Sequence, residues 1–203
     1  MSWGDLSAYL FWSGLRPMTE LEFEKACRGT IAPVANGYPW GTTGIASSAY
    51  TLANAGATNE GIATNFSTTV GNANYTPTVG TINSPVRGGI FAANSNNSGR
   101  VTAGASYYGI MELGGNLWER TVVTDNGQGG YYDGSNGTGD LAANGDIDNV
   151  FWISVTSPDG SGFRGGSWAS PPGYLQVSGR TSAINPASGR ANDYGGRGVR
   201  TAP

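Results

Sequence analysis

Residues 16–29, RPMTELEFEKACRG, carry the pattern that decides the fold. Thr19 precedes a run with helical periodicity, and Glu22 follows it by three residues, which is the pattern of a capping box. Gly29 comes directly after the last periodic residue and is typical of a helix end. The stretch therefore predicts a capped helix over residues 20–28.

Upstream of this helix, residues 2–13 place Trp3, Leu6 and Leu10 at helical spacing, with Gly14 as a stop. Downstream, residues 30–105 are rich in Gly, Asn, Thr and Ser and show little periodicity, which predicts long ordered loops.

Short strands are predicted late in the chain. Residues 163–168, FRGGSW, begin a strand-like stretch, and Leu175 and Val177 alternate with polar residues as in a half-buried strand. The closing residues 194–200, YGGRGVR, indicate a turn and then a strand. Early helices, central loops and late short strands predict an α+β fold in one domain over residues 1–203.

Composition limits the chemistry that the chain can perform. There is no histidine, which removes Ser-His-Asp and Cys-His catalysis and His-based zinc, iron and copper sites. The single cysteine, Cys27, lies on the buried face of the predicted helix and is expected to be a small core residue. We expect the core to hold five of the tryptophans, namely Trp3, Trp12, Trp40, Trp118 and Trp168.

Charge and hydropathy exclude several partners. The net charge is −3, so the overall balance does not favour nucleic acid or an anionic membrane. No apolar run approaches the length of a membrane span, and residues 1–12 lack the basic region of a signal peptide. We therefore expect no membrane insertion and no signal peptide in this sequence.

Three segments together resemble the formylglycine-generating-enzyme, or sulfatase-modifying-factor, superfamily. They are residues 16–29 with YPWG at 38–41, then YYGIMELGGNLWER at 107–120, then FRGGSW at 163–168 with GGRGVR at 195–200. Their order and rough spacing match the family. The resemblance implies a C-type-lectin-like fold with short antiparallel strands.

The sequence departs from the catalytic members of that family. The copper-dependent enzymes hold two cysteines after the G-G-S-[WY] motif, and the nearby positions of this chain include Ser170 and Leu175 instead. The ergothioneine-synthase branch needs histidines for iron, and none is present. We therefore predict a non-enzymatic protein that takes no copper, iron or zinc.

Among non-catalytic relatives, the variable proteins of diversity-generating retroelements place hypervariable residues near the C-terminus, between fixed scaffold residues. Residues 167–200 resemble such a region, and by this analogy they form a variable ligand-binding region. The candidate ligand-binding residues are Ser170, Tyr174, Thr181, Ser182, Ile184, Asn185, Ser188, Asn192 and Asp193. Small polar residues and Tyr make adaptable contacts, as in antibody paratopes, and the alternative is an ordinary solvated loop.

The resemblance also implies a structural Ca²⁺ site at the GGNLWE turn. The matching ligands are Glu112, Gly115, Leu117 and Glu119. Side-chain and carbonyl oxygens on an irregular backbone suit Ca²⁺. The alternative is that Glu119 caps a turn or pairs with an arginine.

The C-terminal arginines also have two interpretations. They form either a patch for an acidic or carbohydrate ligand, or forks that bind loop carbonyls and carboxylates inside the fold. We predict the structural role for four of them, namely Arg164, Arg180, Arg197 and Arg200, because these fall on family scaffold positions.

The sequence thus favours a binding protein that recognises a protein or glycan surface, displayed on a cell or phage particle or otherwise extracellular. Two alternatives stay open: a divergent sulfatase-modifying-factor-like enzyme, and a structural module of a surface assembly.

Overall fold

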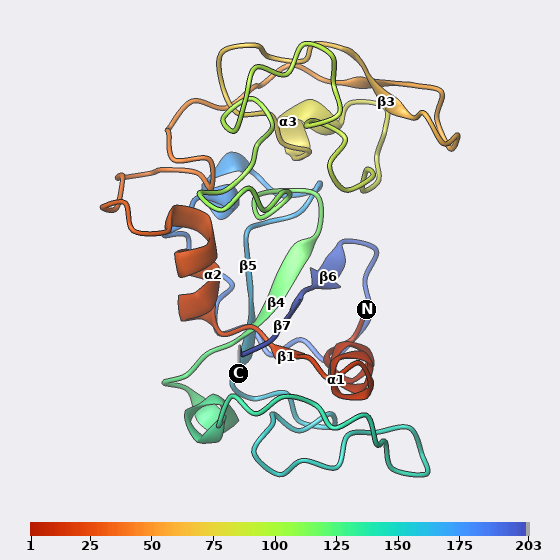
Figure 1. Cartoon of the computed structure of the whole chain (residues 1–203), viewed down its shortest axis with the longest axis vertical. Helices are drawn as coiled ribbons and strands as arrows, with labels where there is room; N and C mark the ends of the chain where they lie inside the picture. Colours follow the sequence, from red (N-terminus) through yellow and green to blue (C-terminus); the bar gives the residue numbers. More distant parts are fainter. Residues whose placement is uncertain (202–203) are drawn as a thin grey trace. The chain divides into compact units, whose positions relative to one another are not determined.

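The computed structural model describes residues 1–201, which form two compact units, each built from discontinuous segments. Unit 1 comprises residues 1–23, 119–164 and 180–201, and unit 2 comprises residues 24–118 and 165–179. Figure 1 shows few regular elements and many loops. The predicted mixture of two main helices with short antiparallel strands is confirmed.

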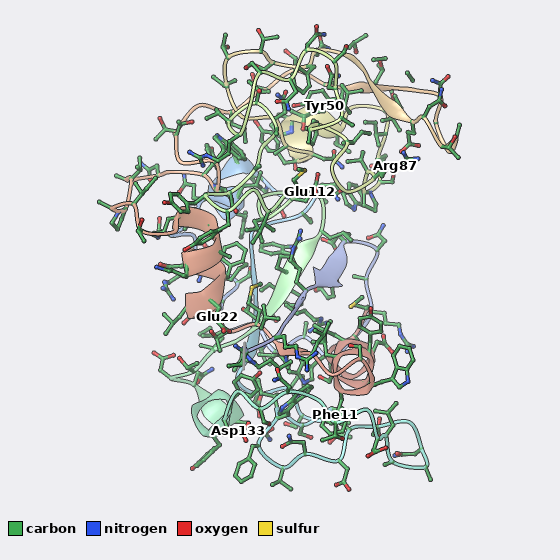
Figure 2. The ribbon with its side chains drawn as sticks, viewed as in Figure 1. Phe11, Glu22, Tyr50, Arg87, Glu112 and Asp133 are labelled. Carbon is green, nitrogen blue, oxygen red and sulfur yellow. The ribbon has the colours of Figure 1, made fainter. Side chains whose placement is uncertain are left out.

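Helix α1, Trp3–Trp12, contributes one apolar face to the hydrophobic core of unit 1. Ser2 caps it: the Ser2 hydroxyl accepts from the Asp5 amide, and the Asp5 carboxylate accepts from the Ser2 amide. Trp3, Leu6 and Leu10 are buried, as their spacing predicts. They cluster with Phe11, Val122, Trp152 and Ile153, and Phe11 (Figure 2) meets the edge of Trp152 at 5.3 Å between ring centroids. Burial of each such side chain stabilises the fold by about 2 kcal/mol.

Helix α2, Glu20–Arg28, begins with the predicted capping box. The Thr19 hydroxyl accepts from the Glu22 amide, and the Glu22 carboxylate accepts from the Thr19 amide. Gly29 follows with φ +60°, and the ring of Tyr107 occupies the place where a side chain at that glycine would lie. Cys27 is fully buried, as predicted.

The strands of unit 1 come from distant parts of the sequence. Strand β1, Arg16–Pro17, pairs antiparallel with β7, Gly198–Val199. Strand β4, Trp118–Val122, is the middle strand of three, between β5, Ser161–Arg164, and β6, Tyr194–Gly196. The β4–β5 pair is antiparallel, with Glu119 opposite Arg164. The connection from β4 to β5 contains a short 3₁₀ helix, η1, Gly127–Tyr131, and otherwise runs as loop (Figure 1).

Unit 2 is held by a short hairpin, two apolar clusters and buried amides. Strands β2, Thr51–Ala53, and β3, Gly61–Thr64, pair antiparallel, and α3, Thr76–Val79, adds one turn. Tyr50 (Figure 2) packs in a cluster with Ile90 and Phe91. Asn116 bonds both the amide and the carbonyl of Val86, so its side chain replaces a missing strand partner.

Two local predictions are wrong. The strand predicted at residues 175–178 does not form, because Leu175 ends a 3₁₀ helix, η2, Pro172–Leu175, and the Gly179 amide then donates to the Gln176 carbonyl in a turn. Leu175 and Val177 are nevertheless both buried. Trp12 is 62% exposed, whereas Trp3 and Trp40 are fully buried. None of the described helices is long and apolar enough to cross a membrane.

Candidate ligand-binding loop

Residues 180–193, which we name the binding loop, include most of the predicted ligand-binding residues. The whole binding loop belongs to unit 1. The loop starts at Arg180, which pairs with the carboxylate of Glu20. The same carboxylate accepts from Arg164 at 3.0 Å, and both Glu20 and Arg164 are buried. The base of the loop is therefore fixed to α2 and β5 by a charge network.

Arg120 holds the far part of the loop from below. Its side chain is fully buried, with the guanidinium 4.5 Å from the centre of the Phe163 ring and 5.2 Å from that of Tyr194. Nη1 donates to the carbonyl of Ala187 at 2.9 Å, and Nη2 donates to that of Gly189 at 3.1 Å. Burial lowers the pKa of Arg120 to about 10, so it remains charged at neutral pH.

Main-chain contacts hold the middle of the loop. The Phe163 amide donates to the Ser182 carbonyl at 2.9 Å, which joins the loop to β5. A Cβ at Gly162 would overlap the carbonyl of Ala183, so the loop approaches the strand closely only because this residue is glycine. Ala183 itself is buried, and the Asn185 amide donates back to Ser182.

The loop backbone is thus held by contacts that involve few of its own side chains. Ile184 is 63% exposed. The other exposed members of the predicted set are Thr181, Asn185, Ser188 and Asn192, while Ser182 and Asp193 are half-buried. The structure therefore brings seven of the nine predicted residues onto one loop, with most of their side chains facing solvent.

The remaining two predicted residues, Ser170 and Tyr174, lie in unit 2. Ser170 is buried, and its hydroxyl accepts from the Ser167 amide at 2.9 Å. The prediction that Ser170 forms part of an exposed surface is therefore wrong, because its hydroxyl stabilises the turn after the GGS motif. Tyr174 is half-buried and meets the edge of Trp118 at 5.5 Å.

Three of the predicted structural arginines have carboxylate partners. Arg164 and Arg180 share Glu20, and Arg197 pairs with Glu119. The structural interpretation is confirmed for these three. Arg190, at the end of the binding loop, is exposed and pairs with Asp5, whose pKa it holds well below the usual range.

The predicted Ca²⁺ ligands belong partly to each unit. In unit 2, the Glu112 carboxylate (Figure 2) accepts from the Gly89 amide at 2.9 Å, and Gly115 and Leu117 follow in the turn. In unit 1, Glu119 is buried against Arg197, which is the arginine pairing stated as the alternative. Within residues 1–201, no three His, Cys, Asp or Glu side chains gather as metal ligands do. Ca²⁺ at this turn stays a prediction.

Arg120, which holds the binding loop, was not predicted from the sequence. Arg120 directly follows Glu119 at the end of the motif YYGIMELGGNLWER, so the family motif was the sequence signal that could have drawn attention to it. Only the fold shows that its partners are carbonyls of residues 187 and 189, far along the chain.

The sequence matches the sulfatase-modifying factor enzyme 1-like domain over residues 1–202. The chain belongs to this family. It is also similar to the hercynine oxygenase of Mycolicibacterium smegmatis, with 29% identity over 175 residues, which is 86% of this chain. The chain spans 31% of that relative's length. No solved structure matches. Membership confirms the fold expected from the resemblance, while the lectin-like description stays a prediction.

Proposed function

We propose that this member of the sulfatase-modifying-factor family is a non-enzymatic ligand-binding protein of the kind found as variable proteins of diversity-generating retroelements. Its recognition surface is the binding loop. One observation carries the proposal: the loop is held through its own carbonyls by buried groups of the scaffold, chiefly Arg120. Side chains that do not hold the loop can change without loss of its conformation.

The exposed side chains indicate the class of ligand. Ile184 supplies one exposed apolar contact, and it is flanked by the amide of Asn185 and the hydroxyl of Ser182. Small polar residues around an apolar anchor suit a protein or glycan surface, because they combine adaptable hydrogen bonds with a desolvated contact. We place the protein outside the cell, on a cell surface or on a phage particle.

The chain's own residues argue against the rival proposal of an enzyme. Ser170 and Leu175 lie near the positions where the copper-dependent relatives carry cysteines, and both side chains are buried. The similar hercynine oxygenase is an enzyme by name, but this chain has no histidine to supply as an iron ligand.

Activity assays test the non-enzymatic proposal. The protein is incubated with a cysteine-containing sulfatase peptide and Cu(I), and separately with hercynine, Fe(II) and oxygen. Mass spectrometry follows both substrates. We expect neither to change beyond the protein-free control. Conversion of the peptide cysteine to formylglycine, or oxidation of hercynine, would establish an enzyme and overturn the proposal.

A further inference from the structure

Unit 2 contains an apolar pocket that the binding loop does not use. Its enclosed part measures about 30 Å³, which is more than a single water needs and close to the volume of one methyl group. Cys27, Tyr38 and Val177 are buried in its wall. The Tyr107 ring, packed over Gly29, forms another side.

Two arginines line this pocket, and no carboxylate is among the described residues that line it. The Arg100 guanidinium donates to no described residue, and a Cβ at Gly41 would lie 3.4 Å from its Nη2. Arg28 binds Glu24 through Nη2, but its Nε is buried and has no acceptor within residues 1–201. The pocket therefore offers guanidinium donors that an anion can satisfy.

Apolar side chains continue from the pocket onto the surface around it. Ile31 is 48% exposed, Val34 is 44% exposed, and Tyr107 is 38% exposed. A free small acid would fill the pocket and leave this rim uncovered. A polypeptide would cover it with the residues that precede its last one.

We propose that the pocket binds the C-terminal residue of a polypeptide, with the methyl end of its aliphatic side chain inside and its carboxylate held by Arg28 and Arg100. A chain end is the one place in a polypeptide where an aliphatic side chain and a carboxylate share a single residue. Capture of a terminal carboxylate is a recurring mode of peptide recognition. The inference is independent of the proposed function, because the pocket and the binding loop share no residue.

Fluorescence anisotropy tests the proposal with the labelled peptide Gly-Ser-Gly-Ser-Leu. We expect the free acid to bind and the C-terminal amide to bind at least about tenfold more weakly, since the amide lacks the charge that the arginines recognise. Isovalerate should compete only at far higher concentration than the unlabelled peptide. Equal binding of acid and amide, no binding of either, or equal competition by isovalerate would each overturn the proposal.

Arg100→Gln locates the site. Because the Arg100 guanidinium donates no hydrogen bond to the described residues, the variant should melt as the wild type does and bind the peptide acid about tenfold more weakly. Lys25→Gln makes the same charge change on the exposed side of α2, outside the pocket, and should leave binding unchanged. Unchanged binding in Arg100→Gln contradicts the assignment.

Discussion

At the scale of single residues, unit 1 depends on buried charges whose partners lie far apart in the sequence. Glu20 is buried between Arg164, its partner at 3.0 Å, and Arg180. Removal of one of these charges leaves its partners buried without an opposite charge. The loss of folding free energy is then far larger than for a surface ion pair.

Glu20→Gln should therefore lower the free energy of unfolding by about 3 kcal/mol. Glu24→Gln, in the same helix, breaks the half-buried i,i+4 pair with Arg28 and should cost less than about 1 kcal/mol. Urea denaturation of both variants checks the difference. Equal costs would show that the Glu20 network is no more than a surface ion pair.

Arg120 is the residue on which the binding loop depends most. Arg120→Lys keeps a positive charge but cannot reach two carbonyls with a planar fork. We expect the Asn185 amide to exchange with solvent at least about tenfold faster in this variant, because the loop opens more often. Exchange at the wild-type rate would mean that the loop is held without Arg120.

At the scale of elements, the loop separates side chains that pack from side chains that are exposed. The combined substitution Ile184→Ser, Asn185→Ala and Ser188→Ala should change the free energy of unfolding by less than about 1.5 kcal/mol in total. Ala183→Leu, one residue away, should cost about 2 kcal/mol or more, because Ala183 is 4% exposed and has no space beside β5. Thermal unfolding compares the two. A larger cost for the exposed set would remove the argument that the loop tolerates variation.

The LGGNLWE turn permits a direct test of calcium. We expect EDTA to lower the Tm and added Ca²⁺ to restore it, through oxygen ligands at Glu112, Gly115, Leu117 and Glu119. A Tm indifferent to both reagents would eliminate Ca²⁺ and leave the pairing of Glu119 with Arg197 as the device that fixes this segment.

Elements with local signals could be predicted from the sequence, and those that depend on distant partners could not. Both capped helices follow from contacts within one turn, such as Thr19 with Glu22. The prediction of a strand at Leu175 was wrong because alternating apolar residues indicate only which side chains are buried. Leu175 is buried at the end of η2 without forming a strand. The binding loop was located by family resemblance, but its anchor, Arg120, and the burial of Ser170 depend on tertiary contacts.

At the scale of the whole molecule, buried tyrosines determine how stability responds to alkali. Burial raises the pKa of Tyr75 to about 12 and also raises those of Tyr50 and Tyr132. Unfolded tyrosines ionise near pH ~10, so above that pH the folded state binds more protons than the unfolded state. Stability therefore falls as pH rises from 10 towards 12, by at most about 1.4 kcal/mol per pH unit for each tyrosine.

Tyr75→Phe should reduce the fall in the free energy of unfolding with rising pH. Tyr131→Phe should not change that fall, because Tyr131 is 78% exposed. Denaturant unfolding at pH 9, 10 and 11 measures both slopes. The same slope in both variants would show that burial of Tyr75 does not set its ionisation.

The most direct test of the central claim, a scaffold that displays a diversified binding loop, is deep sequencing of this locus across its natural population. We predict that substitutions concentrate between residues 169 and 193, above all at the exposed positions Thr181, Ile184, Asn185, Ser188 and Asn192. The codons of Arg120, Gly162 and Ala183, which hold the loop, should stay fixed. A low and uniform substitution rate across the gene would contradict the account.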